Sequence, residues 1–187
     1  MANPDKPRGF TPVKHTSGAP WNGQTRSVGV TDGTDMFVGD LLSLTTGLAA
    51  VAATNDATLL GVAVGFGKLD DMSNSQGAAF NPDNLSTVYY DDSASTHTDW
   101  VVYYVPIQDM IFEAQTAVDL SASVIGANVD VLATAGNTAT GRSNQEVTTS
   151  TNADFLIVER PVYPNNDSSL INERLFVQAT RAETVFG

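Results

Sequence analysis

The sequence predicts an all-β protein, a single β-barrel or jelly-roll-like sandwich with an extended N-terminal arm. Short apolar runs recur along the chain and are separated by Gly, Asp, Asn and Thr-Gly positions that reverse strands. Thr, Ser, Asn, Asp and Gly are abundant between these runs whereas Lys is scarce, which favours strands and turns over surface helices. Nothing repeats at a fixed period, so we expect neither a solenoid nor a propeller.

The chain has 187 residues, the size of one all-β domain whose core needs no covalent staple. It has no cysteine, so it can form no disulfide framework and no zinc–thiolate site, and it has no cysteine nucleophile. No window approaches about 18 uninterrupted apolar residues, and the N-terminus does not read as a signal peptide. We therefore expect a soluble intracellular product, with residues 28–187 as one β-barrel or sandwich domain.

Residues 32–66 are expected to form the central sheet of this domain. Apolar runs at 36–38, 41–44, 48–53 and 59–66 are separated by strand-reversing residues, which is typical of a β-meander. The two ends of the chain are expected to lie on this sheet.

Residues 1–27 are predicted to form an extended N-terminal arm. Four prolines and three glycines in this segment are incompatible with a helix or a central strand. Phe10, Val13 and Trp21 are apolar anchors with no core of their own, so we expect the arm to become ordered against a partner. With Lys14 and Arg26 they form the predicted partner-binding set.

Charge is distributed unevenly along the chain. The formal net charge is −12, yet residues 1–27 carry Lys6, Arg8, Lys14 and Arg26 against Asp5 alone. An acidic body repels nucleic-acid phosphates and anionic membranes, so we expect neither as a partner. The basic arm suits an acidic protein surface, although the acidic body also has a simpler interpretation as a means of keeping the protein soluble.

The rest of the chain predicts further strands and two polar excursions. Residues 68–86 are expected to form a long surface loop. Residues 87–90 and 100–105 are expected to form a hairpin with a long tip at 91–99. The remaining predictions are a strand at 110–116, a helical turn at 119–123, a strand within 124–132, a polar loop at 135–152, and strands at 155–158 and 174–180.

Four local patterns allow a chemical interpretation, and each has a simpler structural one. Residues 65–68, GFGK, depart from the phosphate-binding pattern because Val62 stands where that pattern needs Gly. His15 and His97 are the two histidines of the chain, and neither has a motif for metal binding or catalysis nearby.

The acidic pairs at 70–71 and 91–92 either bind calcium or supply loop charge, and they lack the spacing of a calcium-binding loop. The tyrosines and tryptophan at 89, 90, 100, 103 and 104 form either a stacking surface or part of the packing. Neighbouring residues on a strand point to opposite faces, which favours packing.

Segments along nearly the whole chain resemble the head decoration, or cement, proteins of tailed bacteriophages. They are MANPDKPRGFTPVKHTSGAPWNG, GTDMFVGDLL, LLGVAVGF, YVPIQDMIFEAQ, VIGANVDVL, TGRSNQEV, FLIVERPVYPNND and RLFVQA. The resemblance implies a structural virion protein without enzymatic activity or cofactor, located on the outer surface of the capsid and assembled in the host cytoplasm. Its implied partners are the major capsid protein and further copies of itself, as a homodimer or homotrimer; the fold is a jelly roll or a tulip-like barrel.

A second function stays open at this point. A head or tail appendage module that recognises host glycan through the aromatic strands would also need a β-rich, cysteine-free domain.

Overall fold

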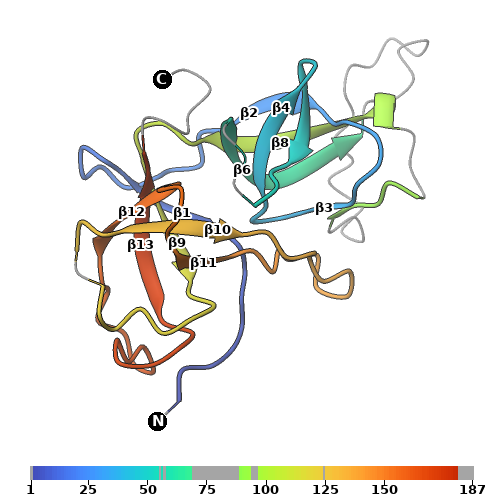
Figure 1. Ribbon diagram of the computed structural model, residues 1–187. Coiled ribbons are helices and arrows are strands. Elements are labelled where there is room, and N and C mark those ends of the chain that lie inside the picture. Colours follow the sequence, from blue (N-terminus) through green and yellow to red (C-terminus); the bar gives the residue numbers. More distant parts are fainter. Residues whose placement is uncertain are drawn as a thin grey trace.

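Figure 1 shows the computed structural model, which describes residues 2–54, 56, 58–68, 89–93, 97–123 and 125–180. These residues contain thirteen strands and one short 3-10 helix. The strands form a six-stranded sheet, a five-stranded sheet and a two-stranded ribbon, and all the strand pairs within them are antiparallel. The prediction of an all-β fold is confirmed.

The six-stranded sheet, here called the terminal sheet, is built from the two ends of the described chain. Its strand order is β1-β9-β13-β12-β10-β11. The strands are β1 (Thr11–His15), β9 (Met110–Gln115), β10 (Asn128–Leu132), β11 (Glu146–Thr149), β12 (Phe155–Glu159) and β13 (Arg174–Ala179).

The five-stranded sheet, here called the inserted sheet, is built from the middle of the chain. Its order is β2-β8-β6-β4-β5, with β2 (Arg26–Gly29), β4 (Leu41–Thr45), β5 (Leu48–Val51), β6 (Leu59–Lys68) and β8 (Trp100–Pro106). The ribbon pairs β3 (Met36–Phe37) with β7 (Tyr89–Tyr90), and the 3-10 helix η1 (His97–Asp99) precedes β8.

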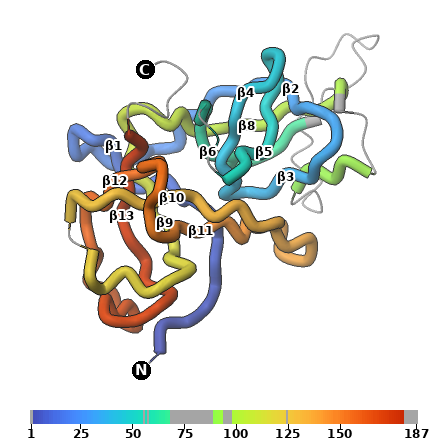
Figure 2. Tube along the Cα trace, in the orientation of Figure 1, coloured from blue at the N-terminus to red at the C-terminus, as the bar shows by residue number. Residues whose placement is uncertain are grey.

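The chain enters the terminal sheet, leaves it, and returns. Figure 2 shows the blue N-terminal segment in the same lobe as the yellow, orange and red strands, with the intervening residues in a second lobe. The connection back is short, because β8 ends at Pro106 and β9 begins at Met110. The meander predicted at residues 32–66 therefore supplies β4, β5 and most of β6 of the inserted sheet. The two ends of the described chain form a separate sheet.

Both sheets curl, but neither closes through a continuous strand ladder. Val30, directly after β2, forms one bridge to Ala49 of the other edge strand β5. Thr116, directly after β9, forms one bridge to Val147 of β11. Single bridges do not make a closed barrel, so the arrangement fits the sandwich prediction better than the barrel prediction.

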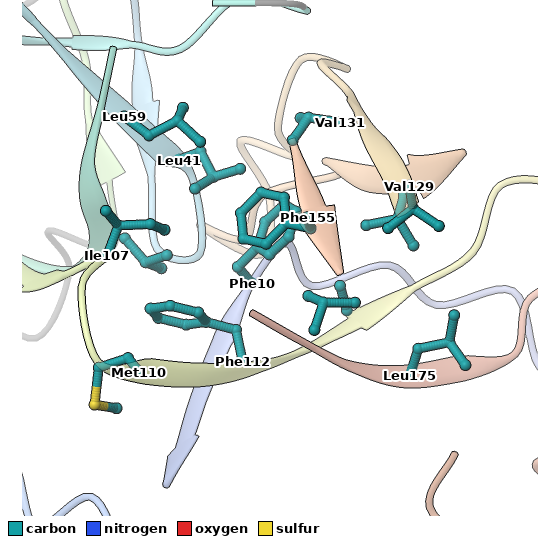
Figure 3. Close-up of a cluster of buried hydrophobic side chains, with 14 of the residues drawn as sticks. Phe10, Leu41, Leu59, Ile107, Met110, Phe112, Val129, Val131, Phe155 and Leu175 are labelled. Carbon is teal, nitrogen blue, oxygen red and sulfur yellow. The ribbon is translucent and has the colours of Figure 1, made fainter. Parts of the chain in front are cut away.

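One hydrophobic cluster joins the two sheets. Phe10 and Phe155 stack at its centre with ring centroids 5.0 Å apart, and both side chains are almost fully buried (Figure 3). The terminal sheet adds Phe112, Val129, Val131 and Leu175, while the inserted sheet and its connections add Leu41, Leu59, Val62, Val105 and Ile107. A second cluster covers the other face of the inserted sheet and includes Met36, Leu42, Tyr90 and Val102.

The N-terminal segment crosses the inserted lobe at a contact between two glycines. The Phe10 N–H donates to the Gly39 carbonyl at 2.8 Å, and the Gly39 N–H donates to the Ala63 carbonyl at 2.8 Å. Gly9 and Gly39 have φ values of 66° and 99°, and a Cβ on either would overlap the backbone of the other segment. Only glycine permits both the backbone conformation and the close approach.

We expect Gly39→Ala to lower the free energy of unfolding by about 3 kcal/mol or more, because left-handed strain and steric overlap add. Gly33→Ala is a matched control: Gly33 has φ 102°, but a Cβ there meets no atom within 4 Å. Its cost should be about 1 kcal/mol, the strain alone. Urea unfolding measures both, and equal costs would contradict the crossing contact.

The prediction of a separate arm at residues 1–27 differs from the structure. Residues 11–15 form β1, which pairs with β9, and Phe10 is 1% exposed in the central cluster. The prolines do not prevent this, since β1 is the edge strand of its sheet and Pro12 lies beside a register shift. Part of the predicted arm is thus a strand of the domain, while exposed residues remain on both sides of it, before Gly9 and in the connection from β1 to β2.

Three smaller predictions also need correction. The strand at 89–90 pairs with β3 and not with β8, because β8 already has β2 and β6 on its two sides. The polar loop predicted at 135–152 contains β11. Residues 119–123 form turns instead of a helical turn, with the Asp119 carboxylate accepting from the Ser121 N–H at 2.8 Å. The loop predicted at 68–86 lies almost wholly outside the described residues.

Candidate functional site

Two connections at one end of the terminal lobe form the candidate site. One joins β9 to β10 and the other joins β12 to β13, and both lie far from the inserted lobe (Figure 1). We call them the distal loops. Surface loops held by a rigid scaffold are where binding residues concentrate in β proteins.

Arg160 ties the distal loops together. Its guanidinium donates to the carbonyls of Leu120 and Ser123 at 2.6 and 2.9 Å, and to the Ser168 carbonyl at 3.4 Å. It also forms an ion pair with the Glu173 carboxylate at 2.6 Å. One side chain therefore fixes both loops relative to each other, as the planar guanidinium fork allows.

The partner carboxylate of Arg160 is deeply buried. The Glu173 side chain is 1% exposed and that of Arg160 is 18% exposed. Burial raises the pKa of Glu173, while Arg160 acts in the opposite direction. The Glu173 N–H is fixed by the Thr116 hydroxyl at 3.1 Å, so the ion pair is anchored to the end of β9.

The N-terminus adds a second clamp. The Asn3 side chain donates to the carbonyls of Asp167 and Ile171 at 2.9 and 3.0 Å and accepts from the Asp167 N–H at 2.7 Å. Asn3 is buried, although the residues that follow it are exposed. The longer distal loop is thus held by both Asn3 and Arg160.

The distal loops expose large apolar side chains. Val162 is 98% exposed, Ile125 63% and Ile171 50%. Only two other large apolar residues in the described part of the chain are exposed, Leu44 and Leu132, both less than 40%. Single exposed apolar residues are ordinary, but the three most exposed ones all lie on the distal loops, which makes these loops the candidate contact region.

The five residues of the predicted partner-binding set do not form one surface. Phe10 lies in the core, and Val13 and Trp21 are half-buried. Lys14 forms an ion pair with Glu159 at 2.8 Å and lies over the Phe176 ring. Arg26 is exposed at the start of β2.

Trp21 and Arg26 both line a groove between the two sheets. This groove has a volume of about 400 Å³ and is also lined by His15, Tyr104 and Asp109. The Trp21 indole N–H is satisfied by the Gln24 carbonyl at 3.1 Å. Asp109 has φ 59° in the short connection that returns the chain to the terminal sheet.

The aromatic residues considered as a stacking surface are mostly packed into the protein. Tyr90 is fully buried and meets Trp100 edge-on, with centroids 5.8 Å apart. Tyr89 stacks on Phe37 at 4.9 Å, and Tyr104 is 7% exposed. The packing interpretation is therefore correct for these side chains.

The polar patterns have structural roles. Residues 65–68 lie within β6, and His15 lies in β1. The Asp92 carboxylate accepts from the Gly33 N–H at 2.8 Å and the Tyr90 hydroxyl at 3.0 Å, so it has a structural role. No group of three or more His, Asp or Glu within the described residues is placed to share a metal ion, and the pair at 70–71 lies outside them.

Sequence reasoning missed Arg160, Asn3 and the exposed Val162. The sequence predicts only the strands on either side of the segment that contains Arg160, at 155–158 and 174–180. The prolines at 161 and 164 are typical of a turn directly after Arg160, but no feature of the sequence identifies the partners of its side chain.

No protein-family model, curated protein or solved structure matches the chain. In the described part of the chain, no helix has the length and apolar character needed to cross a membrane.

Proposed function

We propose that this chain is a structural virion protein, a decoration or cement protein that binds the outer surface of a phage major capsid lattice and stabilises the head. The proposal rests on the resemblance given by the sequence segments and on the clamped distal loops. It assigns the protein no enzymatic activity and no cofactor.

The distal loops are the observation that carries this proposal. A protein that reinforces a lattice needs contacts that are ordered before binding, because ordering a loop on binding reduces the affinity. Arg160 and Asn3 fix the loops in advance. Three exposed apolar side chains, each gaining up to about 1.5–3 kcal/mol on full burial, give a modest contact that the symmetry of a shell repeats many times.

The charge distribution supports the same choice of partner. A chain with a net charge of −12 is repelled by nucleic acid and by anionic membranes. An apolar contact on an acidic protein favours a protein surface instead, namely the major capsid protein. Further copies of this chain are the second expected partner.

Co-sedimentation with shells of the major capsid protein from the same phage tests the proposal. The double variant Val162→Asp/Ile171→Asp should lose most shell binding and keep its stability, since both side chains are exposed. Binding of the unmodified protein should persist at about 1 M salt, because screening weakens charge pairs far more than apolar contacts.

Leu44→Asp is the matched control, since Leu44 is 38% exposed on β4 of the inserted lobe. It should bind shells as the unmodified protein does. Full binding by the double variant, or equal loss in the control, would reject the distal loops as the contact. Absence of binding by the unmodified protein would reject the proposed function.

A further inference from the structure

The groove between the two sheets, here called the interlobe groove, has the size and lining of a small-molecule site. Its volume is about 400 Å³, within the range of ligand sites in proteins. Part of its lining is apolar and buried: Leu60, Tyr104, Val105 and Met110. The remainder is largely polar. An apolar lining with a few convergent polar groups is typical of a site that binds a small organic molecule.

Trp21 is fixed in the groove through both its backbone and its side chain. Its backbone N–H donates to the Val13 carbonyl at 3.2 Å, and its indole N–H donates to the Gln24 carbonyl at 3.1 Å. The side chain is half-buried and packs against the central hydrophobic cluster. Because the indole N–H already has its partner, the ring offers a ligand mainly its flat apolar surface. A ring that is fixed in advance loses little conformational entropy on binding.

The connection from β8 to β9, which also lines the groove, is held from two directions. The Ile107 N–H donates to the Leu60 carbonyl of the inserted sheet at 3.1 Å. The Asp109 carbonyl accepts from the Thr16 N–H, directly after β1, at 2.9 Å. The backbone of the groove is therefore ordered before any ligand binds.

Four polar side chains of the groove are free to bind a ligand: Gln24, Arg26, Gln108 and Asp109. None of these side chains forms a hydrogen bond or an ion pair with the part of the chain that the structure describes. A carboxylate only accepts hydrogen bonds, a guanidinium only donates them, and an amide does both. The groove therefore offers donors together with acceptors, and the charges of Arg26 and Asp109 offset each other.

This lining disfavours three classes of ligand. A phosphate or another anion would meet the Asp109 carboxylate and a chain of net charge −12. A wholly apolar molecule would leave Arg26 and Asp109 desolvated without partners. A metal ion needs several ligands, and the described residues include no group of three or more His, Asp or Glu placed to share one.

We propose that the interlobe groove binds a neutral sugar. The hydroxyl groups of a sugar both donate and accept, which matches the mixed set of Arg26, Asp109 and the two amides. The C–H groups on one face of its ring pack against the flat, electron-rich surface of an aromatic side chain, here Trp21. Its lack of net charge suits a groove whose two charges offset each other.

The sugar site uses different residues from the proposed capsid contact. The groove includes Met110 at the start of β9, whereas the first distal loop follows the end of this strand. Sugar binding and shell binding can therefore be tested separately in the same protein.

Saturation-transfer NMR of the full chain with a fixed set of sugars tests the inference. The neutral members are glucose, galactose, mannose, N-acetylglucosamine, maltose, cellobiose and lactose, and glucuronic acid is the anionic member. At least one neutral sugar should receive magnetisation from the protein, most strongly at the protons of one ring face. A titration then gives the dissociation constant of the sugar with the strongest response.

Variants of the groove should weaken the binding of that sugar. Trp21→Ala should weaken it by about tenfold or more, because a fixed aromatic ring often supplies much of the binding energy. Arg26→Ala and Asp109→Asn should each weaken it by about threefold or more, since each removes a charged partner. Arg26 and Asp109 are exposed, and Asn tolerates the positive φ of Asp109, so both variants should fold.

Tyr163→Ala is the matched control, because Tyr163 is also a half-buried aromatic residue on a loop, but on a distal loop. It should bind the sugar as the unmodified protein does. Thermal melting checks that each variant folds, and Arg26→Ala with Asp109→Asn decides the matter if Trp21→Ala does not fold.

Three results would overturn the inference: no transfer to any neutral sugar of the set, unchanged binding by the groove variants, or equal weakening by Tyr163→Ala. Shell binding by the groove variants should be unchanged. Its loss in Trp21→Ala, together with no response to any sugar, would assign the groove to the capsid protein instead.

Discussion

Deleting residues 2–15 should prevent the protein from folding to its native state. This deletion removes strand β1, which pairs with β9. It also removes Phe10, which stacks on Phe155, and the crossing contact with Gly39. The single change Phe10→Ala should already cost about 3–5 kcal/mol, the usual cost of truncating a buried Phe. Small domains have only about 5–15 kcal/mol of stability, so this is a large fraction.

Urea unfolding followed by tryptophan fluorescence measures the effect. Val13→Ala is the matched control, because Val13 is half-buried on β1, shortly after Phe10, and its truncation should cost much less. A truncated protein that unfolds as cooperatively as the full chain would restore the separate arm predicted from the sequence. That prediction implied nearly intact stability, so the two outcomes differ clearly.

Asp130→Ala should have the second large effect. The Asp130 carboxylate accepts hydrogen bonds from the backbone N–H groups of residues 151–154 and from the hydroxyls of Ser150 and Thr151. It therefore shapes the turn between β11 and β12. Removing it leaves several polar groups without partners, and we expect a loss of about 3 kcal/mol or more.

The same site predicts how stability depends on pH. Burial alone would raise the pKa of Asp130, but the N–H groups of Thr151 and Asn152 and the Ser150 hydroxyl lower it to about 2. The folded-state pKa is below the unfolded value, so this stabilisation is present above about pH 4 and is lost as the pH falls through about 2.

Melting temperatures recorded between pH 5 and pH 2 test this dependence. Asp130→Asn keeps one acceptor oxygen but cannot ionise, so its melting temperature should fall less steeply than that of the unmodified protein. Parallel curves for the two proteins would contradict the role given to the Asp130 carboxylate.

The strands that could be predicted are those whose signal is local. In β9, Phe112 and Ala114 alternate with the more polar Glu113 and Gln115, and this period of two identifies the strand without knowledge of its neighbours. By contrast, β11 has Val147 as its single strong apolar residue. The turn that follows β11 is held by Asp130, which lies in β10.

The N-terminal segment could not be placed from sequence because its partners are distant. Phe10 stacks on Phe155, and Pro12 pairs with Phe112 on an edge that tolerates proline. The prolines and glycines of the segment exclude a helix and a central strand, but they do not show which strand the segment pairs with. Such long-range pairing is decided by the whole core and leaves no pattern in the segment itself.

The candidate site was equally hidden in the sequence. Arg160 bonds to carbonyls near residue 120, and Asn3 bonds to a loop more than 160 residues away. The prolines near Arg160 indicated a turn, but they did not indicate that the turn is rigid. Exposure of Val162 also depends on the fold, since the same residue type fills the core elsewhere.

Electron cryomicroscopy of shells mixed with the protein tests the proposed function most directly. We expect added density at every symmetry-equivalent position on the outer surface of the shell, with the distal loops of the terminal lobe against the capsid protein. Bare shells, or density confined to the tail or to one vertex, would contradict a decoration protein.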